Sequence, residues 1–124
     1  THYFILFADL KDKVLNNKII KNLKKHSSKE KYLLSSVKSN HQKFEEKRYW
    51  RGPVWINCNW IIYQGLKNKN IKLAKQIKRK TINLVKQKGF NEYFSCKTGK
   101  GFGATNFSWT AALFLDLILE NKND

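Results

Sequence analysis

The fold of this 124-residue chain is decided by residues 49–66, YWRGPVWINCNWIIYQGL. After Gly52 and Pro53 the stretch is apolar on most sides of a helix. Proline is favoured at the first helical position, because it has no N–H that could be left unpaired there. A helix that is apolar all round is buried between other elements. The stretch therefore predicts a buried helix from about Val54 to Leu66.

Two further helices are predicted downstream. Residues 70–88 place apolar side chains on one stripe and lysines opposite, which is the pattern of an amphipathic helix. Residues 90–107 contain three glycines and are predicted to form a loop. Residues 108–120, SWTAALFLDLILE, are nearly all apolar and predict a last, buried helix with Ser108 or Asn106 as its N-cap.

The first part of the chain is less regular. Residues 2–10 form a short apolar segment, and residues 12–25 carry apolar side chains at helical spacing among lysines. Residues 27–48 are predicted to be a long polar connection, a type of loop that is usually functional or packed on other structure. The whole pattern predicts an all-α chain whose most apolar helices need a larger core than this length readily supplies.

Positive charge dominates the composition, with 25 Lys and Arg against 9 Asp and Glu and a formal net charge of +16. It gathers in residues 11–48 and 67–100, whereas the aromatic-rich residues 49–66 and 101–119 are nearly free of it. Only three basic residues are arginine, the side chain that readers of base sequence favour. We therefore expect mainly a solvated lysine surface, and a basic helical nucleic-acid-binding protein stays as an alternative.

Composition also weighs against several other classes of protein. No apolar run reaches the roughly 18–20 residues that a membrane span needs, and no signal segment opens the chain, so we expect a cytoplasmic protein. Cys58 and Cys96 lack the spacing of a zinc site, and we expect no metal and no cofactor. The chain begins at Thr1 without methionine, which favours a piece of a larger domain.

The segment from Arg48 to Trp60 is the first candidate site. It interleaves aromatic residues with Arg51 and two asparagines. A pyranose ring has an apolar face and a rim of hydroxyls, so aromatic rings with amides and one arginine are typical of a sugar site. The same aromatic residues could instead form the core around a buried helix. We expect a core role for Trp60 and a site role for the aromatic residues nearer the start of the helix.

The second candidate site is the loop of residues 90–107, whose single acidic residue is Glu92. Aromatic residues flank this glutamate on both sides. A lone carboxylate among aromatic side chains suits general acid or base catalysis. An ordinary surface glutamate near Lys97 or Lys100 is equally consistent with the composition.

A family resemblance is carried by two motifs, YWRGPVWINCNWIIYQGL (49–66) and GFNEYFSCKTGKGFGATNFSWTAALFLDLI (89–118). Together they resemble glycoside hydrolase family 63, near its mannosylglycerate and glucosylglycerate hydrolases, in the clan of the trehalases and processing α-glucosidases. The resemblance implies that residues 1–124 are the C-terminal portion of a single (α/α)₆ barrel domain whose N-terminal part is absent. It also implies an inverting glycosidase, in which one carboxyl protonates the leaving oxygen and another activates water.

The resemblance assigns the role of general base to Glu92. The residues implied to contact the sugar are Tyr49, Trp50, Arg51, Gly52, Trp55, Asn59, Tyr93, Phe107 and Trp109. The general acid of the family is an aspartate far upstream that nothing here matches, so we expect this piece alone to be inactive. The implied substrate is an α-glucosidic or α-mannosidic bond in a small glycoside or oligosaccharide.

The implied partners are the carbohydrate and the upstream remainder of the barrel, with no membrane and no nucleic acid. A non-catalytic carbohydrate-binding relic of such a barrel is the first alternative to the enzyme.

Overall fold

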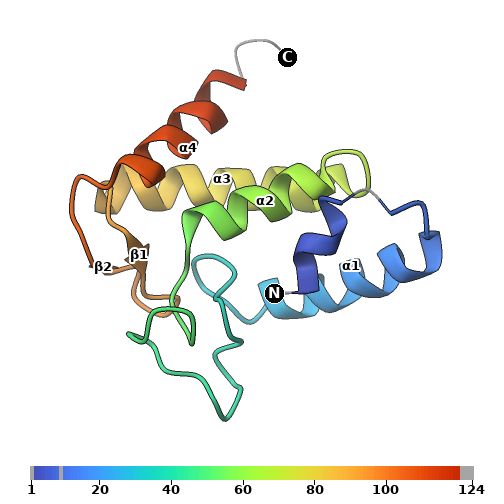
Figure 1. Ribbon diagram of the computed structural model, residues 1–124, viewed down its shortest axis with the longest axis horizontal. Helices are drawn as coiled ribbons and strands as arrows, with labels where there is room; N and C mark the ends of the chain where they lie inside the picture. The colour runs from blue at the N-terminus through green and yellow to red at the C-terminus, as the bar shows by residue number, and fades with distance from the viewer. Residues whose placement is uncertain (1, 9, 121–124) are drawn as a thin grey trace.

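The computed structural model describes residues 2–8 and 10–120 (Figure 1). The elements follow in the order η1 (His2–Leu6), α1 (Lys13–Ser27), α2 (Ile56–Leu66), α3 (Ile71–Lys88), β1 (Tyr93–Phe94), β2 (Gly101–Phe102) and α4 (Ser108–Leu119). The predicted helical class is confirmed. The predicted loop of residues 90–107 also contains the antiparallel β1–β2 hairpin, the only sheet within the described ranges.

Helices α2 and α3 lie side by side and antiparallel at the centre of the fold, joined by a short turn (Figure 1). Helix α3 buries one stripe of apolar side chains and exposes most of its lysines, as its periodicity predicts. The Asn70 side chain caps α3 by accepting the Leu73 N–H at 3.1 Å. Gly89 ends it with φ of 82°, where a side chain would be strained.

Helix α2 begins later than its sequence predicts. The sequence places Pro53 and Val54 in its first turn, but both precede the helix, which starts at Ile56. Val54 instead exchanges two backbone hydrogen bonds with Phe94, at 2.8 and 2.9 Å, and pairs with Ser35 on its other side. The backbone groups of this segment are thus used to tie two loops together rather than to open a helix.

Internal hydrogen bonds hold the long connection between α1 and α2 in place. The Oε1 atom of Glu30 accepts the Ser35 hydroxyl at 3.1 Å and the Ser39 N–H at 3.0 Å. His26 lies against the same buried pair, with its Nε2 atom 3.1 Å from the Ser35 hydroxyl. Desolvation opposes ionisation of this carboxyl, but its hydrogen bonds lower the pKa of Glu30 to about 2. The connection is therefore packed on the core, as its length predicts.

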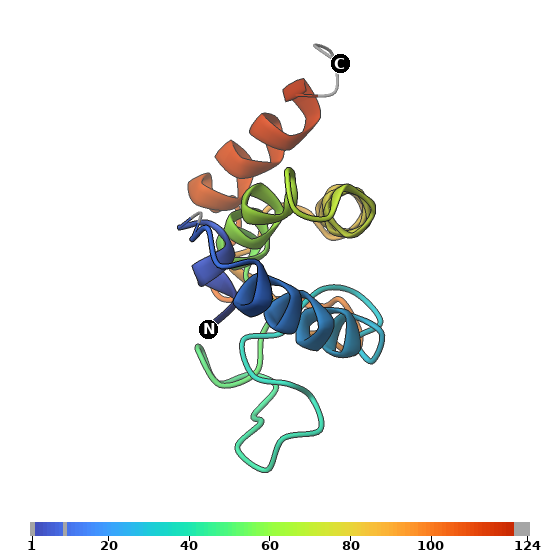
Figure 2. The same cartoon turned by 90° about the vertical axis from the view of Figure 1, so that its right-hand side faces the viewer.

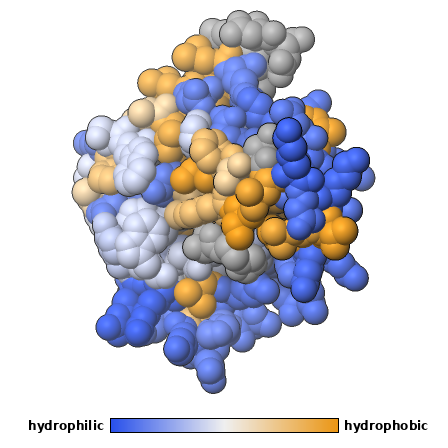
Figure 3. Space-filling model, turned by 45° about the vertical axis from the view of Figure 1, so that its right-hand side comes forward, coloured by the Kyte–Doolittle hydropathy of each residue, from blue (hydrophilic) through white to orange (hydrophobic). Residues whose placement is uncertain are grey.

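Helix α4 crosses α2 and α3 and rises away from the other helices towards its C-terminal end (Figures 1 and 2). Only Thr110 and Leu117 of α4 are buried, so the prediction that this helix is buried is wrong within the described chain. Its half-exposed apolar side chains are Trp109, Leu115 and Leu119. Figure 3 shows apolar side chains on the surface at the upper end of the molecule, where α4 lies.

The physical reason is a shortage of neighbours, because an apolar helix needs packing on several sides and the described residues cover only one. The predicted N-cap is also wrong. Phe107 occupies that position, and no side chain caps the helix.

Candidate functional site

Four aromatic rings gather at the start of α2. The Trp55 ring is stacked between Trp50, with centroids 4.3 Å apart, and Tyr93, with centroids 5.0 Å apart. The Tyr49 ring meets Trp55 edge to face at 4.7 Å. Trp55 is buried, whereas Tyr49 and Trp50 are 47% and 49% exposed. The cluster therefore has a buried base and an exposed aromatic surface, which we call the aromatic platform.

The backbone under the aromatic platform is strained. Tyr49 has φ of 23°, outside the regions that side chains normally allow, and the Trp55 Nε1–H donates to its carbonyl at 2.9 Å. Gly52 follows in the same turn, where a Cβ atom would lie 2.2 Å from the Glu45 carbonyl oxygen. Strain of this kind persists where the surroundings hold it, and it clusters at functional sites.

Glu92 lies beside the platform in the hairpin that contains Tyr93. Its N–H donates to the Ala104 carbonyl at 2.9 Å, and its Oε2 atom accepts the Ala104 N–H at 3.0 Å. Gly103 makes room for this arrangement, because a Cβ atom at that position would lie 2.4 Å from the same Oε2 atom. The backbone thus fixes the direction of the carboxylate.

The Tyr49 hydroxyl lies near the Glu92 carboxylate. Desolvation and the negative charge of Glu92 together raise the pKa of Tyr49 above its ordinary value. The phenol therefore stays protonated at neutral pH. The Ala104 backbone and the Tyr49 phenol, from different segments, thus both lie against a single carboxylate.

A narrow crevice joins Glu92 and Trp55 to Phe107 and Trp109 at the start of α4, and it is too narrow to admit a water molecule. Phe107 is partly buried, and Trp109 is half exposed. The predicted groups therefore face an open surface rather than an enclosed pocket.

Two predicted site residues are engaged elsewhere. The Arg51 guanidinium is exposed and donates to Glu45 at 2.8 Å. Asn59 is fully buried, and its amide donates to the carbonyls of Leu34 and Trp55 and accepts the Leu34 N–H. An amide saturated in this way holds the loop against α2, so the structure does not bring Asn59 to the site surface.

Asn57, the other asparagine of the first candidate site, lines the crevice, and its side chain accepts the Cys58 N–H at 2.9 Å. Sequence reasoning missed two contributors to this arrangement. Gly103 has φ of 72°, and the run of glycines around it was the available signal for a special backbone position. Ala104 acts through its backbone alone, and no feature of its side chain could have indicated that role.

Across residues 2–8 and 10–120, no three His, Cys, Asp or Glu side chains gather as a metal site would require. In the same ranges no helix is long and apolar enough to cross a membrane.

Comparison with known proteins identifies relatives of this chain. The family model of the mannosylglycerate hydrolase MGH1-like glycoside hydrolase domain matches residues 1–110. Mannosylglycerate hydrolase of Thermus thermophilus is 46% identical over 88 residues, which are 70% of this chain and 21% of that protein. Mannosylglycerate hydrolase MGH2 of Selaginella moellendorffii is 48% identical over 73 residues, 58% of this chain and 15% of the relative. The chain thus spans about a fifth or less of these curated relatives.

Two solved structures are similar over most of the described chain. Both are family 63 mannosylglycerate hydrolase from Thermus thermophilus, one in complex with Tris and D-glycerate and one with glucose. Each has a TM-score of 0.82 and 38% identity and covers 90% of this chain, which corresponds to 28% and 29% of the solved chains. The predicted resemblance and the predicted fold class, a partial helical barrel, are confirmed.

Proposed function

The chain belongs to the family of mannosylglycerate hydrolase MGH1-like glycoside hydrolase domains, and from this membership we propose that it carries the base-bearing wall of a glycosidase active site. One observation supports the assignment above the others. The Glu92 carboxylate is held by the Ala104 N–H and lies near the Tyr49 hydroxyl at the edge of the aromatic platform. A sugar stacked on the platform would present its rim of hydroxyls and its anomeric carbon towards this carboxylate.

In the proposed reaction Glu92 is the general base. It accepts a proton from a water molecule that attacks the anomeric carbon on the face opposite the leaving group. The Ala104 N–H orients the carboxylate, so that a free lone pair points towards that water. Trp50 and Tyr49, with exposed rings, supply the stacking surface, and Phe107 and Trp109 extend it towards α4.

The reaction needs a second carboxyl group, roughly 6.5–9.5 Å from the base in inverting enzymes, to protonate the leaving oxygen. We propose that an upstream segment supplies it, and that residues 1–124 are the C-terminal portion of a single (α/α)₆ catalytic domain. The half-exposed α4 is then covered by that segment. It follows that the 124-residue chain alone releases no sugar.

The proposed substrate is an α-glucosidic or α-mannosidic bond in a small glycoside or oligosaccharide. Relatives named as mannosylglycerate and glucosylglycerate hydrolases support a small hydroxy acid as one leaving group. The location in the cytoplasm predicted from the sequence stays a prediction.

The decisive experiment replaces Glu92 in the complete protein. Glu92→Gln keeps the size and the hydrogen bond from the Ala104 N–H but removes the base. We expect kcat on an α-mannoside or α-glucoside of glycerate to fall about 10²–10⁴-fold, while the Kd for the sugar changes little.

Asp12→Asn is the matched control, since Asp12 caps α1 and lies outside the site. It is expected to keep wild-type turnover. Wild-type turnover in Glu92→Gln would refute the assignment of the base. A complete protein that binds the sugar but never hydrolyses it would instead support the non-catalytic relic.

A further inference from the structure

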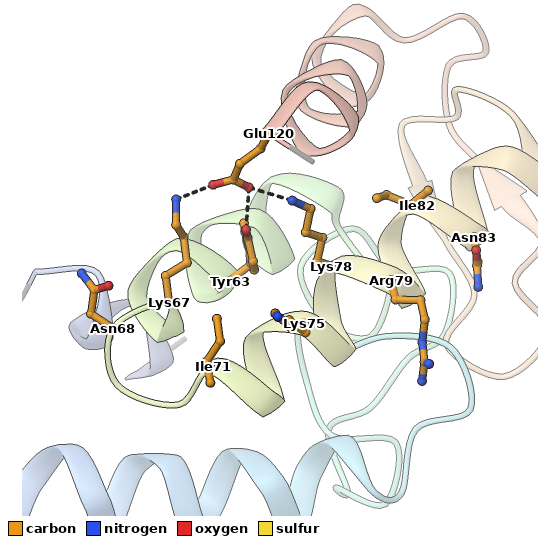
Figure 4. A pocket seen from close by; sticks show the side chains of 10 residues that line it. All are labelled: Tyr63, Lys67, Asn68, Ile71, Lys75, Lys78, Arg79, Ile82, Asn83 and Glu120. Atoms are coloured by element: carbon orange, nitrogen blue, oxygen red, sulfur yellow. Dashed lines mark hydrogen bonds and ion pairs between the residues drawn. The ribbon is translucent and has the colours of Figure 1, made fainter. Parts of the chain in front are cut away.

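A cavity of about 710 Å³ opens at the opposite end of α2 from the aromatic platform (Figure 4). Helix α2 has 11 residues, so at about 1.5 Å per residue the two places are separated by about 16 Å of helix. The walls come from the C-terminal end of α2, from α3 and from the end of α4. The lining side chains are Tyr63, Lys67, Asn68, Ile71, Lys75, Lys78, Arg79, Ile82, Asn83 and Glu120.

Glu120 occupies one side of this cavity and is saturated with donors. Lys67, Lys78 and the Tyr63 hydroxyl all donate to its carboxylate, and the Lys78 Nζ atom lies 3.0 Å away (Figure 4). The Lys78 side chain is only 9% exposed. Desolvation opposes ionisation, but the three donors lower the pKa of Glu120 to about 2. The site is therefore already built to hold one carboxylate between two ammonium groups.

Lys75 and Arg79 add two further positive charges to the same cavity. They lie one turn apart on α3, and like charges at this spacing repel each other. Neither has an ion pair with any acidic side chain in the described part of the chain. The cavity is thus lined by four cationic side chains and one carboxylate, so it has an excess of positive charge.

The remaining walls favour an organic ligand over a bare ion. Asn68 and Asn83 carry amides that both donate and accept hydrogen bonds, which suits hydroxyl groups. Ile71 and Ile82 supply apolar surface, and Ile71 is 56% exposed. A volume of about 710 Å³ is within the range of small-molecule sites.

We propose that this cavity binds a small hydroxylated organic anion, a sugar acid or a sugar phosphate, whose charge lies between Lys75 and Arg79. The amides of Asn68 and Asn83 contact its hydroxyls. Glu120, Lys67 and Lys78, which we call the Glu120 clamp, form a fixed wall that keeps the cavity open. The site is separate from the aromatic platform, so it stands or falls independently of the proposed glycosidase function.

The test is titration of the complete protein with gluconate and with glucose 6-phosphate at a constant ionic strength of about 0.15 M, where long-range charge effects are largely screened. Calorimetry gives the Kd, and backbone amide shifts locate the ligand. We expect saturable binding of at least one anion, with shifts concentrated in residues 67–83. Neutral glucose should cause none of these shifts, and inorganic phosphate should bind at least about tenfold more weakly because it lacks the hydroxylated body.

The double variant Lys75→Ala/Arg79→Ala should weaken binding at least about tenfold, because both charge-assisted contacts are lost. Lys72→Ala/Lys86→Ala removes the same charge from exposed positions of the same helix and should change the Kd less than about twofold. Circular dichroism checks that both variants fold.

Binding of gluconate alone assigns the site to carboxylates, and binding of glucose 6-phosphate alone assigns it to phosphates. The proposal fails if neither anion binds, if both double variants lose affinity equally, or if inorganic phosphate binds as tightly as the organic anions. Glu92→Gln should leave this binding unchanged, which separates the result from any test of catalysis.

Discussion

At the N-terminal end of α2 the Glu92 carboxylate accepts a hydrogen bond from a backbone N–H and lies near the Tyr49 phenol. At the C-terminal end the Glu120 carboxylate accepts hydrogen bonds from two ammonium groups and a phenol. Neutral donors orient a carboxylate through hydrogen bonds alone, whereas ammonium donors add the attraction of a full opposite charge. The first arrangement suits a group that must accept a proton during a reaction. The second suits a group that joins two helices. The difference shows how donors from the surrounding structure assign different tasks to the same side chain.

The largest expected effect on stability comes from a substitution in the aromatic platform, which lies beside Glu92. Trp55→Ala deletes a buried ring that is stacked against Trp50 and Tyr93, and it should lower the free energy of unfolding by about 3–5 kcal/mol. Urea unfolding followed by circular dichroism measures the change. Trp109→Ala is the control, since that ring is half exposed, and an equal loss there would show that burial of Trp55 is not the cause.

A smaller loss is expected at the other end of α2. Glu120→Gln leaves the nearly buried Lys78 ammonium without its counter-charge, and about 1–2 kcal/mol of stability should be lost after allowance for partial exposure of the pair. The same urea assay applies. Glu45→Gln breaks exposed pairs with Arg48 and Arg51 and should change little. Equal effects of the two substitutions would contradict a structural role for the Glu120 clamp.

The difference between wild type and Glu120→Gln should itself depend on pH. The folded-state pKa of Glu120 is about 2, below its ordinary value of 4.5, so its ionised form stabilises the fold above pH 4.5. That contribution is lost as the pH falls from about 4.5 through about 2. The gap in unfolding free energy between the two proteins should therefore close over this window, and a gap of constant size would count against the assignment.

The smallest global effect is expected from Gly103→Ala. The added methyl group meets the Glu92 Oε2 atom and strains a residue with φ of 72°, which should cost about 1 kcal/mol of stability. In the complete protein turnover should fall more than stability does, because the carboxylate is displaced. Ala104→Gly keeps the N–H that binds Glu92 and should preserve turnover; if it reduces kcat as much as Gly103→Ala, positioning by this backbone turn is not the cause.

The helices at the centre were predictable because periodicity and capping signals act within one element. Helix α3 has an amphipathic stripe, Asn70 before it and Gly89 after it, and each signal is local. Pro53 misled the prediction because its segment is recruited by Phe94, a residue far along the chain, and local preference cannot reveal such pairing. The prediction for helix α4 failed for a different reason. Apolar content predicts that a helix is buried, but it does not show which element covers the helix.

The residues of the candidate site likewise divide into those that the sequence indicated and those that only the structure reveals. Residue type and resemblance indicated Glu92 and the aromatic rings, and the structure brings them together. Asn59 has an amide of the kind that binds sugar hydroxyls, but its side chain lies in the core, and only its buried position reveals this. The strained backbone of Tyr49 and the Ala104 N–H depend on the detailed shape of two turns, which residue type does not reveal. The contacts of Glu120 join segments far apart in the chain, which spacing alone does not encode.

The paired backbone of Val54 and Phe94 links the loop before α2 to the hairpin that carries Glu92. Both residues are fully buried, so their amide hydrogens can reach solvent only when the two segments separate. Opening at this joint would detach Tyr49 and Glu92 from each other in one event. Slow hydrogen exchange at these two amides would therefore report the lifetime of the assembled site without any substrate being present.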